Sequence, residues 1–227
     1  MSIIKKYKSE VERVVNPIPG IYTVTFNSEK KFDYSPGQFL HLAIDEYDGT
    51  GQWPESRCFS MQSNPNNKKL KITFAVKGNF TRRMAEELRP GGEIWLKLPY
   101  GDIFQRGHSF ENCVFVAGGT GLTPFLSLFT NDSFSGYSNP KLYFGVRSKE
   151  YDIFEEEIAA AKELNDSFKI KRICQDVEGI LDVKKIHQEN RNSTYFISGP
   201  PVMIKSFKNY LRSEGVEDKK IITDEWE

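Results

Sequence analysis

A glycine-rich turn in the second half of the sequence has the residue types of a phosphate-binding loop. It follows the apolar run at residues 113–117 and reads Gly118-Gly119-Thr120-Gly121-Leu122-Thr123-Pro124. Glycines without Cβ atoms let backbone N–H groups approach a phosphate at the positive end of a following helix. The turn lacks the lysine of a P-loop and the third glycine of the dinucleotide fingerprint. It therefore indicates either a nucleotide site or an ordinary strand-to-helix turn.

Two segments of the first hundred residues suggest similar chemistry. In an extended segment, Arg57 could hold a phosphate, Phe59 could cover a planar ring, and Ser60 could hydrogen-bond a ring nitrogen. Further on, a glycine turn enters a short helix and reads Lys77-Gly78-Asn79-Phe80-Thr81. Its N-terminal amides could bind a second anion. The alternatives are a barrel strand with a surface arginine and simple helix capping.

A late turn could complete the nucleotide site. The segment ends a strand, starts a helix and reads Ser198-Gly199-Pro200-Pro201-Val202-Met203. Ligands of open α/β sheets bind at the carboxyl ends of the strands, so Ser198 and Gly199 should lie beside whatever Gly119 and Gly121 hold. The alternative is a turn without a ligand.

The elements that must position these motifs change character near residue 107. Before it, short alternating strands at 20–26, 39–44, 70–76 and 93–98 are separated by turns, which is typical of a β-barrel. One short helix interrupts them, with Asn79 or Thr81 as its predicted N-cap and Arg89-Pro90-Gly91-Gly92 as its stop. The sequence predicts an antiparallel β-barrel domain in residues 1–106.

After residue 107, apolar strands alternate with helical stretches. Strands are predicted at 113–117, 141–146, 168–173 and 194–198, and helices at 154–164, at 183–189 and from Val202 onward. This alternation indicates a mainly parallel sheet with right-handed crossovers. Residues 107–227 are therefore predicted to form an α/β domain.

Composition argues against several classes of function. The 227 residues include 31 Lys and Arg against 31 Asp and Glu, so no excess positive charge exists to bind nucleic acid or an anionic membrane. No apolar run approaches the roughly 20 residues that span a bilayer, and the N-terminus lacks a signal-like segment. We expect a cytoplasmic protein without membrane insertion. The three cysteines are too few for a cysteine-ligated iron–sulfur cluster, and neither they nor the three histidines show metal-ligand spacing, so no metal site is predicted.

Taken in order, motifs along almost the whole chain resemble the ferredoxin-NADP reductase superfamily. The motifs are Pro36-Gly37-Gln38, Arg57-x-Phe59-Ser60, Gly78-x-x-Thr81, Pro99-x-Gly101-x-Ile103-Phe104, Gly118–Pro124, Tyr143-x-Gly145-x-Arg147 and Ser198-Gly199-Pro200-Pro201-x-Met203. The resemblance implies a six-stranded antiparallel barrel that holds a flavin, usually FAD, and a five-stranded parallel sheet that binds NADH or NADPH. It also implies an active site between the two domains.

The same resemblance implies roles for the barrel residues. Arg57 would pair with the flavin phosphate, Phe59 would pack on the isoalloxazine ring, and Ser60 would hydrogen-bond near flavin N5. The turn from Lys77 to Thr81 would hold the pyrophosphate through Gly78 and Thr81, which favours FAD over FMN. Phe59 replaces a more usual tyrosine and keeps the ring but not the hydroxyl.

For the second domain, the resemblance implies a dinucleotide held by Gly118 to Pro124. Arg147 would reach the adenosine half, and Gly199, Pro200 and Met203 would line the nicotinamide end. Ser198 stands where many members have a cysteine beside nicotinamide C4, and a hydroxyl can still contact the carboxamide.

The end of the chain resembles members in which a terminal aromatic residue covers the flavin. Asp224 and Trp226 are the matching acidic and aromatic residues, and a frayed tail is the alternative. With Ser60 and Ser198, Asp224 completes the set of catalytic candidates. Their task would mostly be positioning, because the redox chemistry belongs to the cofactors.

The predicted function is an NAD(P)H-dependent flavoprotein reductase. It would pass electrons from bound FAD to a separate acceptor such as a ferredoxin, an oxygenase component or a cytochrome. The alternatives are a reductase of small acceptors, such as free flavin or ferric complexes, and an electron-transfer subunit that is active only within a larger complex. The preference between NADH and NADPH stays open, because Arg147 and Lys149 could bind a 2′-phosphate whereas Asp152 and Asp176 could repel it.

Overall fold

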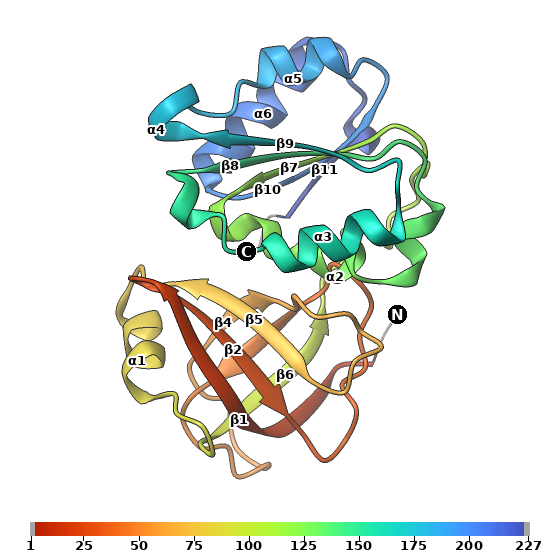
Figure 1. Cartoon of the computed structure of the whole chain (residues 1–227). Coiled ribbons are helices and arrows are strands. Elements are labelled where there is room, and N and C mark those ends of the chain that lie inside the picture. Colours follow the sequence, from red (N-terminus) through yellow and green to blue (C-terminus); the bar gives the residue numbers. More distant parts are fainter. Residues whose placement is uncertain (1–2, 225–227) are drawn as a thin grey trace. The chain divides into compact units, whose positions relative to one another are not determined.

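Two separate β-sheets dominate the computed structural model, which describes residues 3–224 (Figure 1). The chain divides into one unit that ends at Asp102 and another that begins at Ile103. The boundary predicted at residues 106/107 lies in the same irregular segment, between strands β6 (Glu93–Tyr100) and β7 (Cys113–Gly118). Each sheet has its own hydrophobic core, so each unit can be described by itself.

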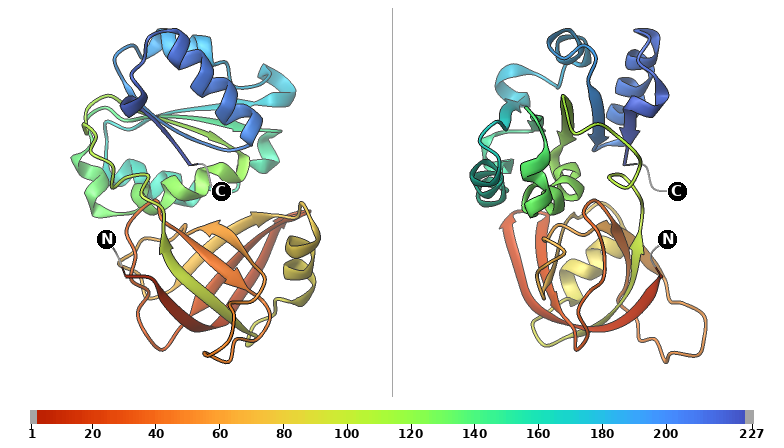
Figure 2. Two further views of the ribbon diagram at one scale, coloured as in Figure 1. Left: turned by 180° about the vertical axis from the view of Figure 1, so that it is seen from behind. Right: turned by 90° about the vertical axis from the view of Figure 1, so that its right-hand side faces the viewer.

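The first sheet is antiparallel, with strand order β4-β3-β6-β1-β2-β5. Besides β6, its strands are β1 (Lys5–Ile18), β2 (Ile21–Asn27), β3 (Phe39–Ala43), β4 (Ser56–Ser60) and β5 (Leu70–Ala75). Alternation sets the inner face, as Val24 and Phe26 in β2 show by being fully buried. The sheet curls into a barrel (Figure 2), and these side chains belong to its core, which confirms the predicted barrel.

β1 is a long central strand that the hydrophobic pattern did not predict. It pairs with both β2 and β6, yet only Tyr7, Ser9 and Val11 along it are buried. Charged and polar residues occupy most other positions, so the strand depends on its two backbone ladders rather than on an apolar face. Sequence periodicity therefore gave little signal here.

The helix of the barrel unit, α1 (Asn79–Glu87), has its N-cap one residue before the first predicted candidate and three residues before the second. The N-cap is Gly78, so the prediction of Asn79 or Thr81 was wrong. Thr81 lies inside the helix, where its hydroxyl accepts the backbone N–H of Lys77 (2.9 Å) and of Gly78 (3.1 Å). Phe80 is among the residues that pack the helix against the barrel core.

The second sheet is parallel, with strand order β11-β10-β7-β8-β9. Besides β7, its strands are β8 (Lys141–Val146), β9 (Lys169–Cys174), β10 (Thr194–Ser198) and β11 (Ile221–Thr223). The runs at 113–117, 141–146, 168–173 and 194–198 therefore predicted strands correctly. The short edge strand β11 was not predicted.

Helices cover both faces of this sheet (Figure 1). One face packs against α2 (Thr123–Phe129) and α3 (Glu155–Leu164), and the other against α5 (Val183–Glu189) and α6 (Pro201–Ser213). A single helical turn, α4 (Gln175–Glu178), follows β9 and was not predicted. This arrangement confirms the predicted α/β fold. Within residues 3–224, no helix is long and apolar enough to cross a bilayer, and no cluster of three or more His, Cys, Asp or Glu side chains could hold a metal ion.

Candidate functional site

The barrel has an open seam beside the segment that carries Arg57, Phe59 and Ser60. β4 and β5 are the two edges of its sheet, and within the described residues no ladder joins them. The seam closes only after β4 has ended, where Gln62 N–H donates to the Lys71 carbonyl (2.8 Å) and Lys71 N–H donates to Ser63 Oγ (3.0 Å). The strand that carries Arg57, Phe59 and Ser60 therefore lies along an unpaired edge.

Arg57 reaches from this edge to the start of α1. Its guanidinium carbon lies 5.1 Å from the centroid of the Phe80 ring, and the exposed side chain also donates to Glu55 Oε1 (2.8 Å). The fold thus brings together the arginine and the glycine turn that the sequence presented as separate motifs. Neither Glu55 nor Phe80 was a predicted site residue, and only the three-dimensional contacts connect them with Arg57.

Phe59 and Ser60 are more enclosed than the arginine. Phe59 is 8% exposed, and its ring centroid lies 5.9 Å from that of Phe74. Ser60 is 6% exposed, and its register partner is Phe39 on β3. Strand alternation puts Arg57 and Phe59 on one face and Ser60 on the other.

The glycine turn before α1 offers an open helix start. A Cβ atom added to Gly78 would meet no atom within 4 Å, and the first turn contains no acidic residue. Because Thr81 already bonds the amides of Lys77 and Gly78, its hydroxyl shapes the turn. An anion at this helix start would meet the positive end of the helix dipole without a competing carboxylate in that turn.

In the second unit, the turns after β7 and β10 touch backbone to backbone. β7 and β10 are neighbours, with Ser198 opposite Ala117. A Cβ atom on Gly121 would lie 2.5 Å from Gly199 Cα, and one on Gly118 would lie 2.9 Å from Pro200 Cδ. Only glycine permits such approaches.

Gly119, by contrast, faces open space. Its φ is +55° and no atom lies within 4 Å of its would-be Cβ position. Thr123 and Pro124 are buried beneath the turn, and the Thr123 hydroxyl donates to the Thr120 carbonyl (2.9 Å). Thr123 and Pro124 therefore shape the cradle, whereas Gly119 and the half-buried Thr120 lie at its surface.

Ser198 and Asp224 come together at the carboxyl end of this sheet. The Ser198 hydroxyl donates to Asp224 Oδ2 (3.2 Å). Asp224 is itself anchored, because its backbone N–H donates to the Ile197 carbonyl (3.0 Å). Two of the three catalytic candidates thus form a direct contact. Trp226 lies outside the described residues.

Comparison with known families supports the reading of this second unit. Residues 115–209 match the family described as the oxidoreductase NAD-binding domain. We call the second unit the NAD-binding domain after this match to residues 115–209. The matched range includes the Gly118–Pro124 turn, Arg147 and the turn after β10.

The similarity to known proteins extends beyond the second unit. A solved ferredoxin NADP+ reductase from Neisseria gonorrhoeae, determined with bound FAD and NADP, superposes with a TM-score of 0.76 at 19% identity, covering 95% of this chain and 93% of that one. The reductase component of propane 2-monooxygenase from Mycolicibacterium goodii is 28% identical over 86% of this chain and 59% of its own length. The ferredoxin--NAD(P)+ reductase component of the naphthalene 1,2-dioxygenase system from Pseudomonas putida is 33% identical over 66% of this chain and 44% of its own length. The chain thus spans about half the length of these two curated relatives, and the resemblance to the ferredoxin-NADP reductase superfamily is confirmed.

Charged residues of both signs follow β8 and β9 at the carboxyl edge of the sheet, around Arg147. Arg147 is exposed, and its carbonyl accepts the backbone N–H of Asp176 (3.1 Å), so α4 starts beside the end of β8. Asp152 instead pairs with Arg172 (2.5 Å) and is largely buried. Asp152 and Asp176 were the two acidic residues expected to repel a 2′-phosphate. Of these, only Asp176 is on this exposed edge.

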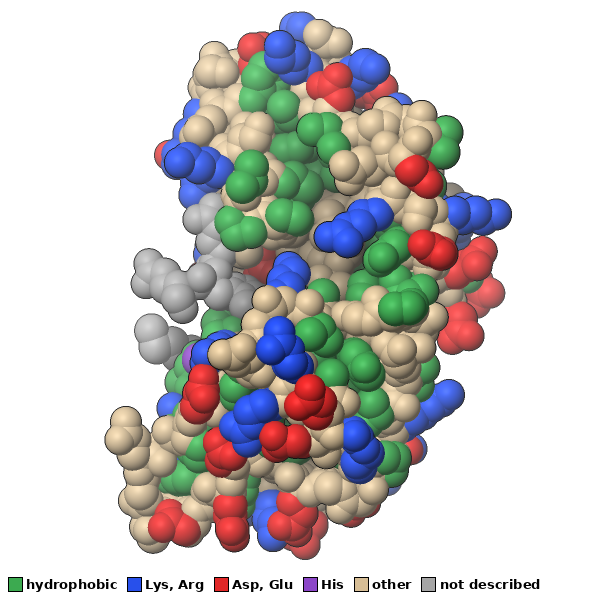
Figure 3. Space-filling model, turned by 90° about the vertical axis from the view of Figure 1, so that its left-hand side faces the viewer, with side chains coloured by type: hydrophobic (Ala, Val, Ile, Leu, Met, Phe, Trp, Pro, Cys, Tyr) green, Lys and Arg blue, Asp and Glu red, His purple; other side chains and the backbone are tan. Residues whose placement is uncertain are grey.

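Apolar side chains are exposed near the same edge. Val177 and Ile180 follow β9, Val202 lies in the first turn of α6, and all three are at least 75% exposed. Figure 3 shows hydrophobic side chains gathered on one side of the NAD-binding domain. Such a surface beside a glycine turn suits the planar base of a nucleotide.

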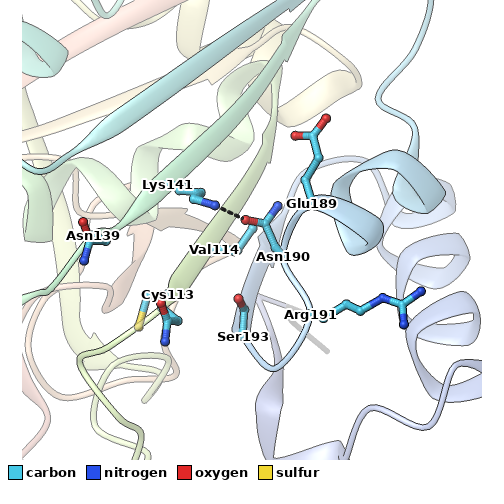
Figure 4. Close-up of a pocket in the computed structure, with 9 residues that line it drawn as sticks. Cys113, Val114, Asn139, Lys141, Glu189, Asn190, Arg191 and Ser193 are labelled. Carbon is cyan, nitrogen blue, oxygen red and sulfur yellow. Dashed lines mark hydrogen bonds between the residues drawn. The ribbon is translucent and has the colours of Figure 1, made fainter.

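The opposite, amino-terminal edge of the sheet holds a small polar cavity (Figure 4). Lys141 Nζ donates to Asn190 Oδ1 (2.7 Å), and Asn190 Nδ2 donates to the Tyr143 hydroxyl (2.8 Å). That hydroxyl donates in turn to Glu189 (2.8 Å), and burial raises the pKa of Tyr143 to about 12. These bonds tie α5 to β8, and the cavity lies away from the carboxyl ends where parallel sheets bind ligands.

Replacing Gly121 with alanine is expected to destabilise the NAD-binding domain by about 1–3 kcal/mol, because the new Cβ would overlap backbone atoms of Gly199 and Ser198 that cannot rotate away. Urea unfolding would measure the loss. Gly136→Ala is the matched control, since its Cβ would meet nothing within 4 Å and should change stability by less than about 0.5 kcal/mol. Equal stability of both variants would contradict the backbone contact.

Proposed function

We propose that the chain is a flavoprotein reductase that takes a hydride from NADH or NADPH, transfers it to bound FAD and delivers electrons to a separate acceptor. The observation that carries the proposal is the convergence of Arg57 and the α1 turn beside an open barrel seam, in a chain whose other unit is an NAD-binding domain. A flavin can accept two electrons as a hydride and release them one at a time, so it connects a two-electron donor to one-electron acceptors.

The barrel residues fit FAD in both charge and space. The Arg57 guanidinium is exposed and can exchange Glu55 for a phosphate, to which it would bind with a charge-assisted hydrogen bond. The open space at Gly78 and the positive end of α1 suit the second phosphate of a pyrophosphate. This second anion position favours FAD over FMN. Phe59 and Ser60 would contact the ring from the edge strand.

In the NAD-binding domain, the residues around the glycine cradle would hold the nicotinamide dinucleotide. Gly119 and Thr120 would face its phosphates, Arg147 its adenosine half, and Pro200 and Met203 the nicotinamide end. Asp224 would hold the Ser198 hydroxyl in one orientation, with the hydroxyl oxygen left to accept a hydrogen bond from the carboxamide N–H. The reaction then depends on how well these groups position the substrate.

Delivery to a separate acceptor draws support from the relatives, which are named as reductase components of oxygenase systems. The acceptor would be a ferredoxin, an oxygenase component or a cytochrome. The proposal includes a cytoplasmic location, where NADH and NADPH are available.

A visible spectrum of the purified protein supplied with FAD tests the proposal. A bound-flavin band near roughly 450 nm should appear and should bleach during anaerobic titration with the preferred nucleotide. The same titration compares NADH with NADPH. Absence of flavin binding, or a bound flavin that neither nucleotide reduces, would overturn the proposed function.

A further inference from the structure

The outer wall of the barrel carries a row of side chains that flavin and nucleotide binding leave unused. Strand register places Cys58, His41, Lys97 and Lys6 side by side across β4, β3, β6 and β1. Neighbouring leucines on β3 and β6 are fully buried, so alternation turns this row outward. The left view of Figure 2 shows the barrel from behind, with β6 in yellow-green crossing it.

Aromatic rings surround this row. The Tyr100 ring centroid lies 4.6 Å from that of His41 and 5.6 Å from that of Phe39. Lys97 Nζ lies 5.8 Å and Lys6 Nζ 5.9 Å from the Trp53 ring. We call this surface the aromatic–lysine face, and its members are Lys6, Phe39, His41, Trp53, Lys97 and Tyr100. All six are half-buried or exposed.

Among the described residues, no carboxylate pairs with the two lysines of this face. Lys6 and Lys97 are direct register partners on the same side of the sheet, an arrangement of like charges that destabilises strand pairing. Within residues 3–224, neither lysine forms an ion pair with a carboxylate, although their neighbours Lys5 and Lys8 do. Burial and the charge of Lys97 both lower the pKa of His41. The face therefore presents positive charge among half-buried rings.

The face also borders the proposed flavin contacts. His41 and Phe39 on β3 are the register partners of Cys58 and Ser60 on β4, the strand that carries Arg57 and Phe59. A protein seated on the face would therefore lie one strand from the flavin that has to reduce it. Exposed Trp and Tyr side chains are enriched in protein interfaces, and complementary charge steers association.

We propose that the aromatic–lysine face docks an acidic redox protein, the acceptor of the reductase reaction. This inference rests on the proposed function. A second copy of the chain is a poor occupant, because a two-fold interface would set the lysine pair against its own copy. Each nucleotide oxidised supplies a hydride, hence two electrons to two one-electron acceptors, and one proton is released.

Two reporter proteins of opposite charge test the proposal, namely an acidic plant-type [2Fe-2S] ferredoxin and a basic cytochrome c. In Lys6→Glu at low ionic strength, reduction of the ferredoxin should slow about 10-fold and reduction of the cytochrome should accelerate. Lys97→Gln should slow the ferredoxin reaction in the same direction. Rates are normalised to nucleotide-driven flavin reduction, measured separately in every variant.

Lys68→Glu is the matched control, since Lys68 is an exposed barrel lysine outside the face. Equal effects of Lys6→Glu and Lys68→Glu on both reporters would overturn the proposal.

A binding experiment distinguishes failure of the docking surface from failure of the proposed reductase function. Binding of oxidised ferredoxin is measured by calorimetry with no nucleotide present. Salt-sensitive binding that Lys6→Glu weakens would support the face even in a chain without reductase activity. Tighter binding of duplex DNA than of ferredoxin would overturn it.

Discussion

FAD binding is expected to weaken about 10- to 100-fold when Arg57 is replaced with alanine. A charge-assisted hydrogen bond contributes about 1.5–3 kcal/mol, and each 1.4 kcal/mol corresponds to a factor of ten in affinity. The substitution also leaves Glu55, now unpaired, close to the proposed phosphate position. Both effects act in the same direction. Quenching of flavin fluorescence during titration of the protein would measure the change.

Two further variants isolate the cause of that loss. Glu55→Ala removes the competing carboxylate and should leave FAD affinity unchanged or higher. Arg13→Ala removes an exposed arginine from β1, away from the seam, and should have no effect. Wild-type affinity in Arg57→Ala would exclude Arg57 from the flavin site.

Flavin reduction by the nucleotide is expected to slow about 10- to 100-fold in Asp224→Ala. This substitution leaves the 3% exposed Ser198 hydroxyl without its acceptor, and an unpaired buried donor costs about 1–3 kcal/mol. The freed hydroxyl would also orient the substrate less well. Anaerobic stopped-flow absorbance would measure the rate, while FAD affinity should stay unchanged because the change lies in the NAD-binding domain.

A conservative variant distinguishes positioning from a general loss of structure. Asp224→Asn keeps an oxygen that can accept the Ser198 hydrogen bond and should retain most of the rate. Asp218→Ala removes an exposed carboxylate paired with Arg212 in the same domain and should not affect the reaction. A wild-type rate in Asp224→Ala would remove the Ser198–Asp224 pair from the mechanism.

The parallel sheet was the most predictable part of the fold. Its strands β7, β8 and β10 are largely buried, so they appear in the sequence as apolar runs, and β8 and β10 have the bounds that these runs predicted. The barrel was harder. β1 has few inward side chains, and the N-cap of α1 is a glycine rather than a residue with a capping side chain.

The candidate site was predictable as a set of residues but not as a set of contacts. The resemblance made Arg57, Ser198 and Asp224 candidates one by one. The hydrogen bond between Ser198 and Asp224 requires β11 to lie beside β10. No apolar run predicted that three-residue strand. Likewise, the approach of Arg57 to Phe80 depends on how α1 packs against the barrel, which local sequence does not encode.

The open seam between β4 and β5 also bears on how the protein must be handled. Unpaired strand edges are templates on which other chains can add, and they promote aggregation when exposed. A flavin lying along the seam would cover that edge and, by binding only the folded chain, would shift the equilibrium away from unfolded forms. Cofactor-depleted preparations should consequently be shorter-lived in storage than loaded ones, and expression yield should track the flavin supply of the host.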